Sequence, residues 1–242
     1  MDKETHAWWK EAAVYQVYPR SFADSNGDGI GDLPGLTGKL DYLRDLGIDA
    51  IWISPVCQSP NRDNGYDISD YCELNPEFGT LADFDRLAAG AHARGIKIIF
   101  DMVCNHSSDQ HPWFLQARSS RQNQIRAFYI WRESRDGCEP NNWKAEFGGS
   151  AWTHNPATGD YYLGVFSPYQ PDLNWENPEL RRRIYEIMLW WARRGVDGFR
   201  LDVFNFLRKA PGLPDVIPPE GASEKQRYYS GSIYYVDQRG IH

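Results

Sequence analysis

The fold is decided by the stretch RGIKIIFD, which covers Arg94–Asp101. Its glycine suits the left-handed position just past a helix C-terminus, and an apolar, β-branched run follows at once. The same junction recurs at Leu46-Gly47-Ile48 and at Arg194-Gly195-Val196. Three copies of helix, glycine and strand predict a chain in which helices and strands alternate.

The runs that follow the glycines are nearly unbroken in their apolar character. They cover Ile48–Ile53, Ile96–Phe100 and Val196–Leu201, and Ala13–Tyr18 supplies an earlier run. Such runs are typical of parallel strands that are covered on both faces. We therefore expect four strands in one parallel sheet.

Three amphipathic helices are expected between these strands. The first has leucines at a spacing of three and four residues over Leu36–Leu46. The second begins at a capping box of Thr80 and Asp83, and the third has Asn177 as its N-cap before Pro178. The predicted order is β-α-β-α-β-α-β, which defines an α/β fold.

An insertion interrupts this repeat after the third strand. Gly47 and Gly95 are 48 residues apart, whereas Gly95 and Gly195 are 100 residues apart. The extra residues lie in the stretch 107–174, which is rich in Trp, Asn, Gly and Pro and has a hairpin signal at Thr158-Gly159-Asp160. We predict a small, irregular subdomain there.

The C-terminal stretch is the second irregularity. After Leu201 the sequence runs for 41 residues with no helical period, although a fourth helix should cover the fourth strand. Four strands cannot close a barrel of eight. We therefore expect the sequence to be the first part of a longer protein.

Charge and composition exclude several classes of function. Lys and Arg number 26 against 33 Asp and Glu, and a net charge of −7 argues against nucleic-acid or anionic-membrane partners. No apolar run nears the roughly 18 residues of a membrane span, and no secretory signal follows Met1. The four cysteines form no C-x-x-C pair, so free thiols in a cytoplasmic protein are expected.

Two of the predicted strands end in candidate catalytic groups, at the edge where parallel α/β folds place their sites. On the fourth strand Arg200 and Asp202 face the same way, because side chains alternate along a strand. A guanidinium beside a carboxylate favours the ionised form that a nucleophile needs, although a structural ion pair is the alternative. The third strand leads from Asp101 to His106, which suits a base, a metal ligand, a sugar donor or a core histidine.

The loop after the second strand presents one ring and one carboxylate. It reads Asn64-Gly65-Tyr66-Asp67, and a solvated turn is the alternative interpretation. The 10 Trp, 14 Tyr and 11 Phe of the chain suit either a core or the stacking of sugar rings.

Oxygen-bearing side chains alternate through the stretch DSNGDGIGD, which covers Asp24–Asp32. With glycine at the sixth position, this pattern is typical of a loop that wraps a hard cation. The twelfth position is Gly35 where an EF-hand needs Glu, so we predict an isolated structural Ca²⁺ or Mg²⁺ loop, with a solvated acidic turn as the alternative. The predicted ligands are Asp24, Asn26, Asp28, Asp32 and the Ile30 carbonyl.

Together these segments resemble the α-amylase superfamily, glycoside hydrolase family 13, and most of all its α-glucosidase and oligo-1,6-glucosidase branch. The likeness extends from Trp8 to the last residue. It is carried by five motifs in the family's order, at Asp24–Asp32, Asn64–Ile68, Asp101–His106, Gln170–Asn174 and Gly198–Val203.

The resemblance implies a fold and a mechanism. Residues 1–106 and 175–242 would form strands 1–4 of a TIM (β/α)₈ catalytic barrel, and residues 107–174 would be the family's inserted B domain. Asp202 would be the nucleophile that forms a covalent glycosyl-enzyme, held ionised by Arg200, which Asp101 would support. The implied sugar contacts are hydrogen bonds from Asp67 and His106, stacking on Tyr66, and pocket walls of Phe166 and Gln170.

The resemblance also implies what the 242 residues lack. A retaining glycosidase needs two carboxyl groups roughly 5 Å apart, and the family's acid is a Glu of the fifth strand. We expect the isolated chain to be inactive and the full-length protein to be a monomeric α-glucosidase without an organic cofactor. It would cut α-1,6 and/or α-1,4 bonds of short gluco-oligosaccharides, and Val203 resembles the α-1,6 members. A glucosyltransferase or isomerase of the branch and a non-catalytic sugar-binding homologue are the alternatives.

Overall fold

The computed structural model describes residues 7–223 and 230–241 and divides the chain into two compact units. The first unit comprises residues 1–58, 72–102 and 188–200, and the second comprises 59–71, 103–187 and 201–242. The predicted boundaries of barrel and B domain stay a prediction. Of the helices in the described ranges, none combines the length and apolar character that a membrane crossing requires.

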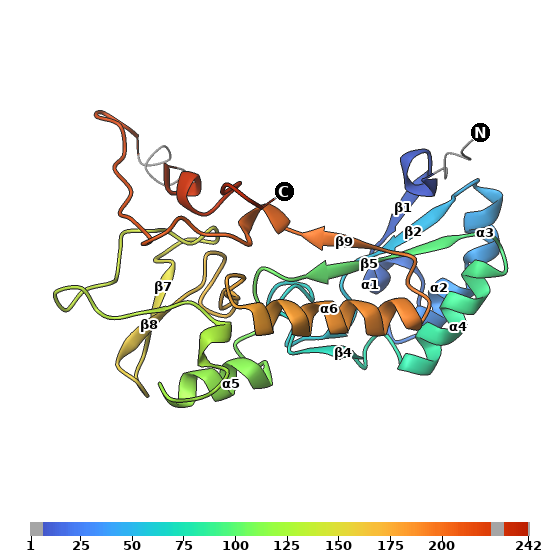
Figure 1. Ribbon diagram of the computed structural model, residues 1–242. Coiled ribbons are helices and arrows are strands. Elements are labelled where there is room, and N and C mark those ends of the chain that lie inside the picture. The colour runs from blue at the N-terminus through green and yellow to red at the C-terminus, as the bar shows by residue number, and fades with distance from the viewer. Residues whose placement is uncertain (1–6, 224–229, 242) are drawn as a thin grey trace, which may run out of the picture. The chain divides into compact units, whose positions relative to one another are not determined.

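Four parallel strands organise the first unit, in the order β1-β2-β5-β9 (Figure 1). Val14 to Val17 of β1 pair with Ala50 to Ile53 of β2, and those residues pair in turn with Lys97 to Phe100 of β5. The predicted parallel sheet is confirmed. Its strands are β1 (Val14–Val17), β2 (Ala50–Ile53), β5 (Lys97–Val103) and β9 (Gly198–Asp202).

Both predicted helix starts are confirmed. Thr80 and Asp83 form the capping box of α4 (Leu81–His92), and the Asn177 side chain accepts hydrogen bonds from the N–H groups of Glu179 and Leu180 at the start of α6 (Pro178–Arg193). These bonds satisfy donors that a helix N-terminus leaves unpaired.

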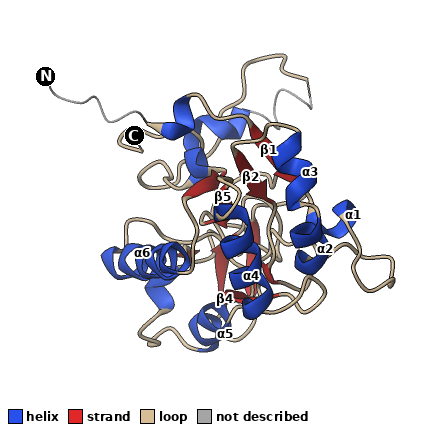
Figure 2. Cartoon of the chain, turned by 90° about the vertical axis from the view of Figure 1, so that its right-hand side faces the viewer, coloured by secondary structure: helices blue, strands red, loops and turns tan. Residues whose placement is uncertain are grey.

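The first predicted helix is in fact two short ones, α2 (Leu33–Gly38) and α3 (Leu40–Asp45). Lys39 breaks the helix between them, directly after Gly38, because glycine is a poor helix former. The two helices bury Leu36, Leu40 and Leu43, as the spacing indicates, whereas Leu46 at the C-cap of α3 is 51% exposed. Figure 2 shows the two helices in succession beside α4. The short elements α1 (Pro19–Phe22), η1 (Trp8–Lys10), β3 (Cys57–Gln58) and β4 (Asp70–Leu74) were not predicted.

Three aromatic rings form the centre of the first unit. Trp191 of α6 stacks on Phe100 of β5 at a centroid distance of 4.2 Å, and Phe84 of α4 meets Trp191 edge-on at 5.0 Å. All three side chains are at most 1% exposed. The cluster therefore fixes two helices to the sheet whose strand ends carry Asp101 and Arg200.

A three-stranded antiparallel sheet, in the order β6-β8-β7, organises the second unit. Residue Gly159 lies in the predicted turn between β7 and β8 and has a φ of 75°, which confirms the hairpin signal. Its strands are β6 (Trp131–Arg132), β7 (Trp152–Asn155) and β8 (Asp160–Leu163), and its helical segments are α5 (Pro112–Ser119), η2 (Arg126–Phe128), η3 (Phe204–Phe206) and η4 (Ser230–Tyr234).

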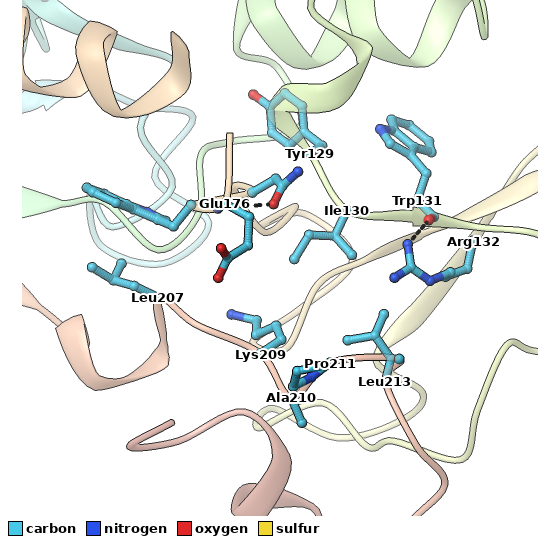
Figure 3. Close-up of a pocket in the computed structure, with 13 residues that line it drawn as sticks. Tyr129, Ile130, Trp131, Arg132, Glu176, Leu207, Lys209, Ala210, Pro211 and Leu213 are labelled. Atoms are coloured by element: carbon cyan, nitrogen blue, oxygen red, sulfur yellow. Dashed lines mark hydrogen bonds between the residues drawn. The ribbon is translucent and has the colours of Figure 1, made fainter. Parts of the chain in front are cut away.

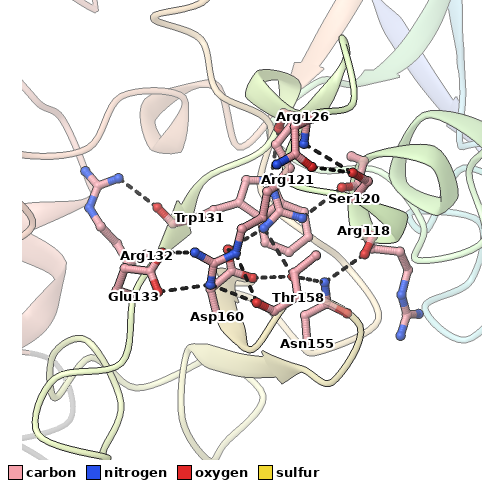
Figure 4. A network of polar contacts seen from close by, with 12 residues as sticks. Arg118, Ser120, Arg121, Arg126, Trp131, Arg132, Glu133, Asn155, Thr158 and Asp160 are labelled. Carbon is pink, nitrogen blue, oxygen red and sulfur yellow. Dashed lines mark hydrogen bonds and ion pairs between the residues drawn. The ribbon is translucent and has the colours of Figure 1, made fainter.

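A buried polar network holds the hairpin in place (Figure 4). Asp160 accepts hydrogen bonds from Arg126 and from Thr158 Oγ1, and it is only 4% exposed. The guanidinium of Arg126 also lies 3.4 Å from the ring centroid of Trp131. Because a buried carboxylate is costly unless it is paired, this network specifies the position of the turn.

The stretch after β9 packs onto this sheet in spite of its missing helical period. Leu213, Val216 and Tyr235 join a core with Trp143 and Trp152. The Nε1 of Trp143 donates to the backbone of the same stretch, at Pro214, over 2.8 Å. In the described part of this stretch the helical segments are short 3₁₀ turns, as the sequence indicates.

Candidate active site

Arg200 is anchored within the first unit by the neighbouring strand. Its Nη1 donates to Oδ1 of Asp101 at 3.1 Å and to Oδ2 at 3.3 Å, and its guanidinium lies 4.9 Å from the Trp52 ring centroid. Asp101 is 1% exposed and also accepts from Trp52 Nε1 at 3.0 Å. Asp101 therefore lies where it can support Arg200, which is the role that the resemblance implies for Asp101.

Asp202 is the last residue of β9 and belongs to the second unit, where it is 7% exposed. Directly after it, Val203 has a φ of 39° and a ψ of 40°. For a β-branched residue this left-handed conformation costs on the order of 1–3 kcal/mol, and such strain is concentrated at functional sites. The chain thus turns sharply away just after the carboxylate.

The loop after β2 separates two carboxylates that the sequence did not distinguish. Asp67 is fully buried, and it accepts hydrogen bonds from Ser59 Oγ at 2.8 Å and from the N–H groups of Arg62 and Asp63 at 3.1 Å. Three bonds from its own loop make Asp67 the residue that closes this turn.

Asp63 is the second carboxylate, and sequence reasoning missed it. It is partly exposed and accepts from Gln170 Nε2 at 2.7 Å. Burial raises its pKa, and the nearby negative charges of Asp67 and Asp202 act in the same direction against the bond from Gln170. The structure therefore brings Asp63 into the electrostatic range of Asp202, at a position where the sequence pattern alone marked only Asp67.

His106 lies in the same unit with the predicted walls of the pocket. Its ring is 5.0 Å from that of Phe166, its Nε2 is 3.2 Å from Gln170 Nε2, and it is 1% exposed. Its pKa is lowered to about 3, mainly by burial and also by the charge of Lys209, and a hydrogen bond with the Tyr66 backbone opposes both effects. His106 is therefore a neutral hydrogen-bonding group at neutral pH and is unsuited to act as a base.

A buried ion pair beside His106 also escaped the sequence reasoning. Lys209 Nζ lies 2.6 Å from Asp172 Oδ2 and donates to Asn105 Oδ1 at 3.0 Å. Burial raises the pKa of Asp172 and lowers that of Lys209. Asp172 belongs to the motif Gln170–Asn174, but Lys209 lies in the stretch without a helical period, so no pattern linked them.

A pocket of about 370 Å³ in the second unit contains none of the predicted site residues (Figure 3). The polar groups on its wall are already engaged. Arg132 donates to the Trp131 carbonyl, Glu176 pairs with Arg208 at 2.7 Å, and Lys209 is committed to its ion pair. We do not regard this pocket as the active site.

The acidic loop of the first unit folds around backbone donors. Asp24 accepts from the N–H groups of Gly27 and Gly29 at 2.7 and 2.8 Å, and the Gly29 bond is the main reason why its pKa is lowered. Asp28 accepts from the Ile30 N–H at 2.8 Å, and Asp32 caps α2 by accepting from the N–H of Gly35 at 2.6 Å.

The predicted cation site stays a prediction, because these bonds hold the loop together without a cation. Asn26 is also tied to Asp28, by a 3.0 Å bond from its Nδ2. In the ranges 7–223 and 230–241, no three His, Cys, Asp or Glu side chains form a group that could hold a metal. A carboxylate oxygen nevertheless has two lone-pair sites, so the N–H bonds do not exhaust the capacity of the loop.

A parallel sheet whose last strand, β9, carries Arg200 and Asp202 at its carboxyl end, with an insertion in the sequence after β5, is typical of α/β barrels. The chain belongs to the α-amylase family, because the pattern described as "Alpha amylase, catalytic domain" matches residues 16–239. The four parallel strands are thus the first part of a TIM barrel.

Within this family, the chain is similar to curated proteins named as glucosidases. The chain is 59% identical over 235 residues to the oligo-1,6-glucosidase of Halalkalibacterium halodurans, covering 97% of this chain and 41% of that protein. It is 60% identical over 211 residues to an α-glucosidase of Pediococcus pentosaceus, covering 87% and 38%. The chain therefore spans about two fifths of the length of the curated relatives that it matches.

Solved structures agree with these relatives. The trehalose-6-phosphate hydrolase of Bacillus licheniformis superimposes with a TM-score of 0.90 at 47% identity, over 97% of this chain and 41% of that one. A mutant of the trehalulose synthase MutB gives a TM-score of 0.86 at 57% identity, over 87% and 38%.

Proposed function

We propose that the whole protein is a retaining α-glucosidase of the oligo-1,6-glucosidase type, acting on short gluco-oligosaccharides. The observation that carries this proposal is Asp202, a mostly buried carboxylate at the carboxyl end of β9 on the same strand as the anchored Arg200. The names of curated relatives that share 59% and 60% identity with the chain support the choice of substrate class.

The proposed mechanism follows from a carboxylate nucleophile. An oxygen of Asp202 attacks the anomeric carbon, the bond from that carbon to the glycosidic oxygen breaks, and a protonated acid gives its proton to the leaving oxygen. The residue that served as the acid then removes a proton from water, and this water displaces Asp202 and releases glucose with its original configuration. Val203 holds the chain in a turn just behind the reacting group.

The sugar contacts of this proposal include one residue more than the resemblance implies. Asp67 hydrogen-bonds a sugar hydroxyl, because the three bonds from its own loop leave lone-pair capacity on its oxygens, and Asp63 is a second carboxylate acceptor beside it. His106 and Gln170 contribute neutral polar atoms beside Asp63. Phe166 and Tyr66 supply the apolar faces.

Turnover by the whole protein tests the proposal. Asp202→Asn should abolish hydrolysis of isomaltose and maltose, whereas Asp45→Asn, which changes an exposed carboxylate on α3, should leave it intact. Polarimetry or NMR of the first product should give the α-anomer. Undiminished turnover by Asp202→Asn, or a β-anomeric first product, would exclude the nucleophile assignment.

The isolated 242-residue chain should not turn over these substrates, since the family's acid lies on a fifth strand. Measurable hydrolysis by this chain, lost in Asp202→Asn, would show that a carboxyl group within it acts as the acid. Comparing isomaltose with maltose on the whole protein tests the α-1,6 preference that Val203 suggests.

A related isomerase or glucosyltransferase is the second candidate, since the structure is similar to that of a trehalulose synthase. Incubation of the whole protein with sucrose distinguishes them, because an isomerase yields an isomeric disaccharide where a hydrolase yields monosaccharides. A non-catalytic homologue would bind glucosides without converting either sugar.

We also propose that the loop Asp24–Asp32 binds Ca²⁺ or Mg²⁺ through Asp24, Asn26, Asp28, Asp32 and the Ile30 carbonyl. A cation there would stabilise the folded loop, so Ca²⁺ should raise the melting temperature and a chelator should lower it. Asp24→Asn should remove the response, and Asp45→Asn should keep it. A melting temperature independent of both cations would contradict the site.

A cytoplasmic location and a monomeric state complete the proposal for the whole protein. Fractionation of the source cells tests the first, and size-exclusion chromatography with light scattering tests the second.

A further inference from the structure

A row of polar side chains connects the buried ion pair with the candidate sugar site, all within the second unit. Lys209 Nζ donates to Asn105 Oδ1 at 3.0 Å, and Asn105 Nδ2 lies 3.2 Å from His106 Nδ1. On the far side of the ring, His106 Nε2 lies 3.2 Å from Gln170 Nε2, which donates to Asp63. Lys209, Asn105 and His106 are all buried.

The charge of Lys209 decides the orientation of the Asn105 amide. An ammonium group has three donors and no acceptor, so it can hydrogen-bond only to the carbonyl oxygen of the amide. The amide nitrogen must then face His106, and it is a donor only. His106 Nδ1 therefore accepts a hydrogen bond and carries no proton.

A neutral imidazole has one ring proton, which must then sit on Nε2. A hydrogen bond with the Tyr66 backbone also raises the pKa of His106, so this backbone segment lies within hydrogen-bonding reach of the ring.

Gln170, at the other end of the row, favours the opposite tautomer. If its amide N–H donated to His106 Nε2, the ring proton would move to Nδ1. The burial of Asn105 and of Gln170's partner Asp63 determines which of the two tautomers is favoured. Turning Asn105 over would place its NH₂ against a fully buried ammonium, where the local dielectric is low, whereas Gln170 needs only one N–H for the partly exposed Asp63.

We propose that Lys209 is a positioning residue, which acts through Asn105 to hold His106 as the Nε2–H tautomer. The ring then offers a donor on the edge that faces Gln170 and Asp63. The consequence for sugar binding rests on the proposed function: a hydroxyl oxygen, which accepts, is the matched partner on this edge. The tautomer itself is a property of the chain without any sugar.

Nuclear magnetic resonance of the 242-residue chain with ¹⁵N-labelled histidine tests this assignment. Two-bond ¹H–¹⁵N correlations distinguish the tautomers, and loss of signals in His106→Gln identifies the ring. The expected pattern is a protonated Nε2 and an unprotonated Nδ1. The reverse pattern in the unmodified chain would overturn the proposal, whether or not the protein hydrolyses glucosides.

Two variants test the cause. In Asn105→Asp a carboxylate accepts from both sides, so the ring proton should move to Nδ1. In the double variant Lys209→Met with Asp172→Asn, which leaves no unpaired buried charge, His106 should show both tautomers. The matched control Lys144→Met, on an exposed lysine of the same unit, should keep the original pattern. An unchanged pattern in both test variants would contradict the role of Lys209.

Discussion

At the scale of single residues, two neighbouring carboxylates differ in how their oxygens are hydrogen-bonded. Asp67 accepts hydrogen bonds from three donors of its own loop. Asp63, in contrast, is partly exposed and accepts a hydrogen bond from Gln170 of another segment. Both lie within a few positions of each other, and both suit a turn. Their difference therefore arises from the path of the loop.

This difference predicts that two conservative variants affect different properties, one chiefly the stability of the chain and the other sugar binding. Asp67→Asn weakens a fully buried acceptor, so we expect a loss of about 1–3 kcal/mol in the free energy of unfolding. Asp63→Asn should weaken sugar binding by the whole protein without a comparable loss. Urea unfolding together with calorimetric titration of the sugar measures both. Equal stability losses would contradict the division of roles.

The pH dependence of stability follows from the raised pKa of Asp63. A carboxyl group whose pKa is higher in the folded state binds more protons when folded, so stability falls as pH rises through that range. Asp63→Asn should remove this slope, while Asp45→Asn should retain it. Urea midpoints measured as the pH rises from the ordinary aspartate pKa of about 3.9 report the difference.

The sequence predicted the strand-end residues of this site and missed those that depend on loops. Arg200 and Asp202 follow from strand alternation, and Asp101 follows from the end of a neighbouring strand. Asp63 and Lys209 lie in segments without periodicity, where the partners of a side chain depend on long-range folding. Their contacts with Gln170 and Asn105 span about a hundred residues of sequence.

At the scale of elements, the aromatic cluster of α4, β5 and α6 determines where the strand ends lie. Trp191 is fully buried against Phe84 and Phe100. The helical spacing of Leu180, Ile184 and Trp191 in the sequence places them on one apolar face. The stacking of the Trp191 ring on β5, in contrast, depends on how the helix returns to the sheet.

Trp191→Ala should therefore cost about 3–5 kcal/mol of folding free energy, through lost burial and the cavity that remains. Leu189→Ala is the matched control, since Leu189 lies on the same helix and is 54% exposed. We expect its cost to stay within about 0.5 kcal/mol. Denaturant unfolding of the two variants measures both values, and similar losses would exclude the cluster as the anchor of α6.

At the scale of the whole molecule, the sequence predicted a parallel sheet with an insertion, and the structure has both. What periodicity could not supply is the packing of the stretch after β9, because Leu213, Val216 and Tyr235 bury irregular backbone against Trp143 and Trp152. Such packing follows no repeat of 2 or 3.6 residues. The same stretch carries Lys209, so the missed segment and the missed residue have one cause.

Buried histidines make the stability of the second unit sensitive to acid. Burial lowers the pKa of His111 to about 3, as it does for His106. Below its ordinary pKa of about 6.5 each ring binds a proton more readily in the unfolded chain, so folding is progressively lost as pH falls from about 6.5 towards 3. His111 also accepts from the Trp113 N–H as the N-cap of α5, a role that asparagine fulfils equally well.

His111→Asn thus removes the titrating ring and retains the cap. The variant also gives up the packing of this ring against Tyr71 and Trp113, but that cost is the same at every pH, so only the slope reports the titration. Relative to this variant, the unmodified chain should lose on the order of 2 kcal/mol of unfolding free energy between pH 7 and 4.5. Urea unfolding across this range measures the difference. If it were constant with pH, His111 would titrate equally in the folded and unfolded chain, and its burial would have no electrostatic consequence.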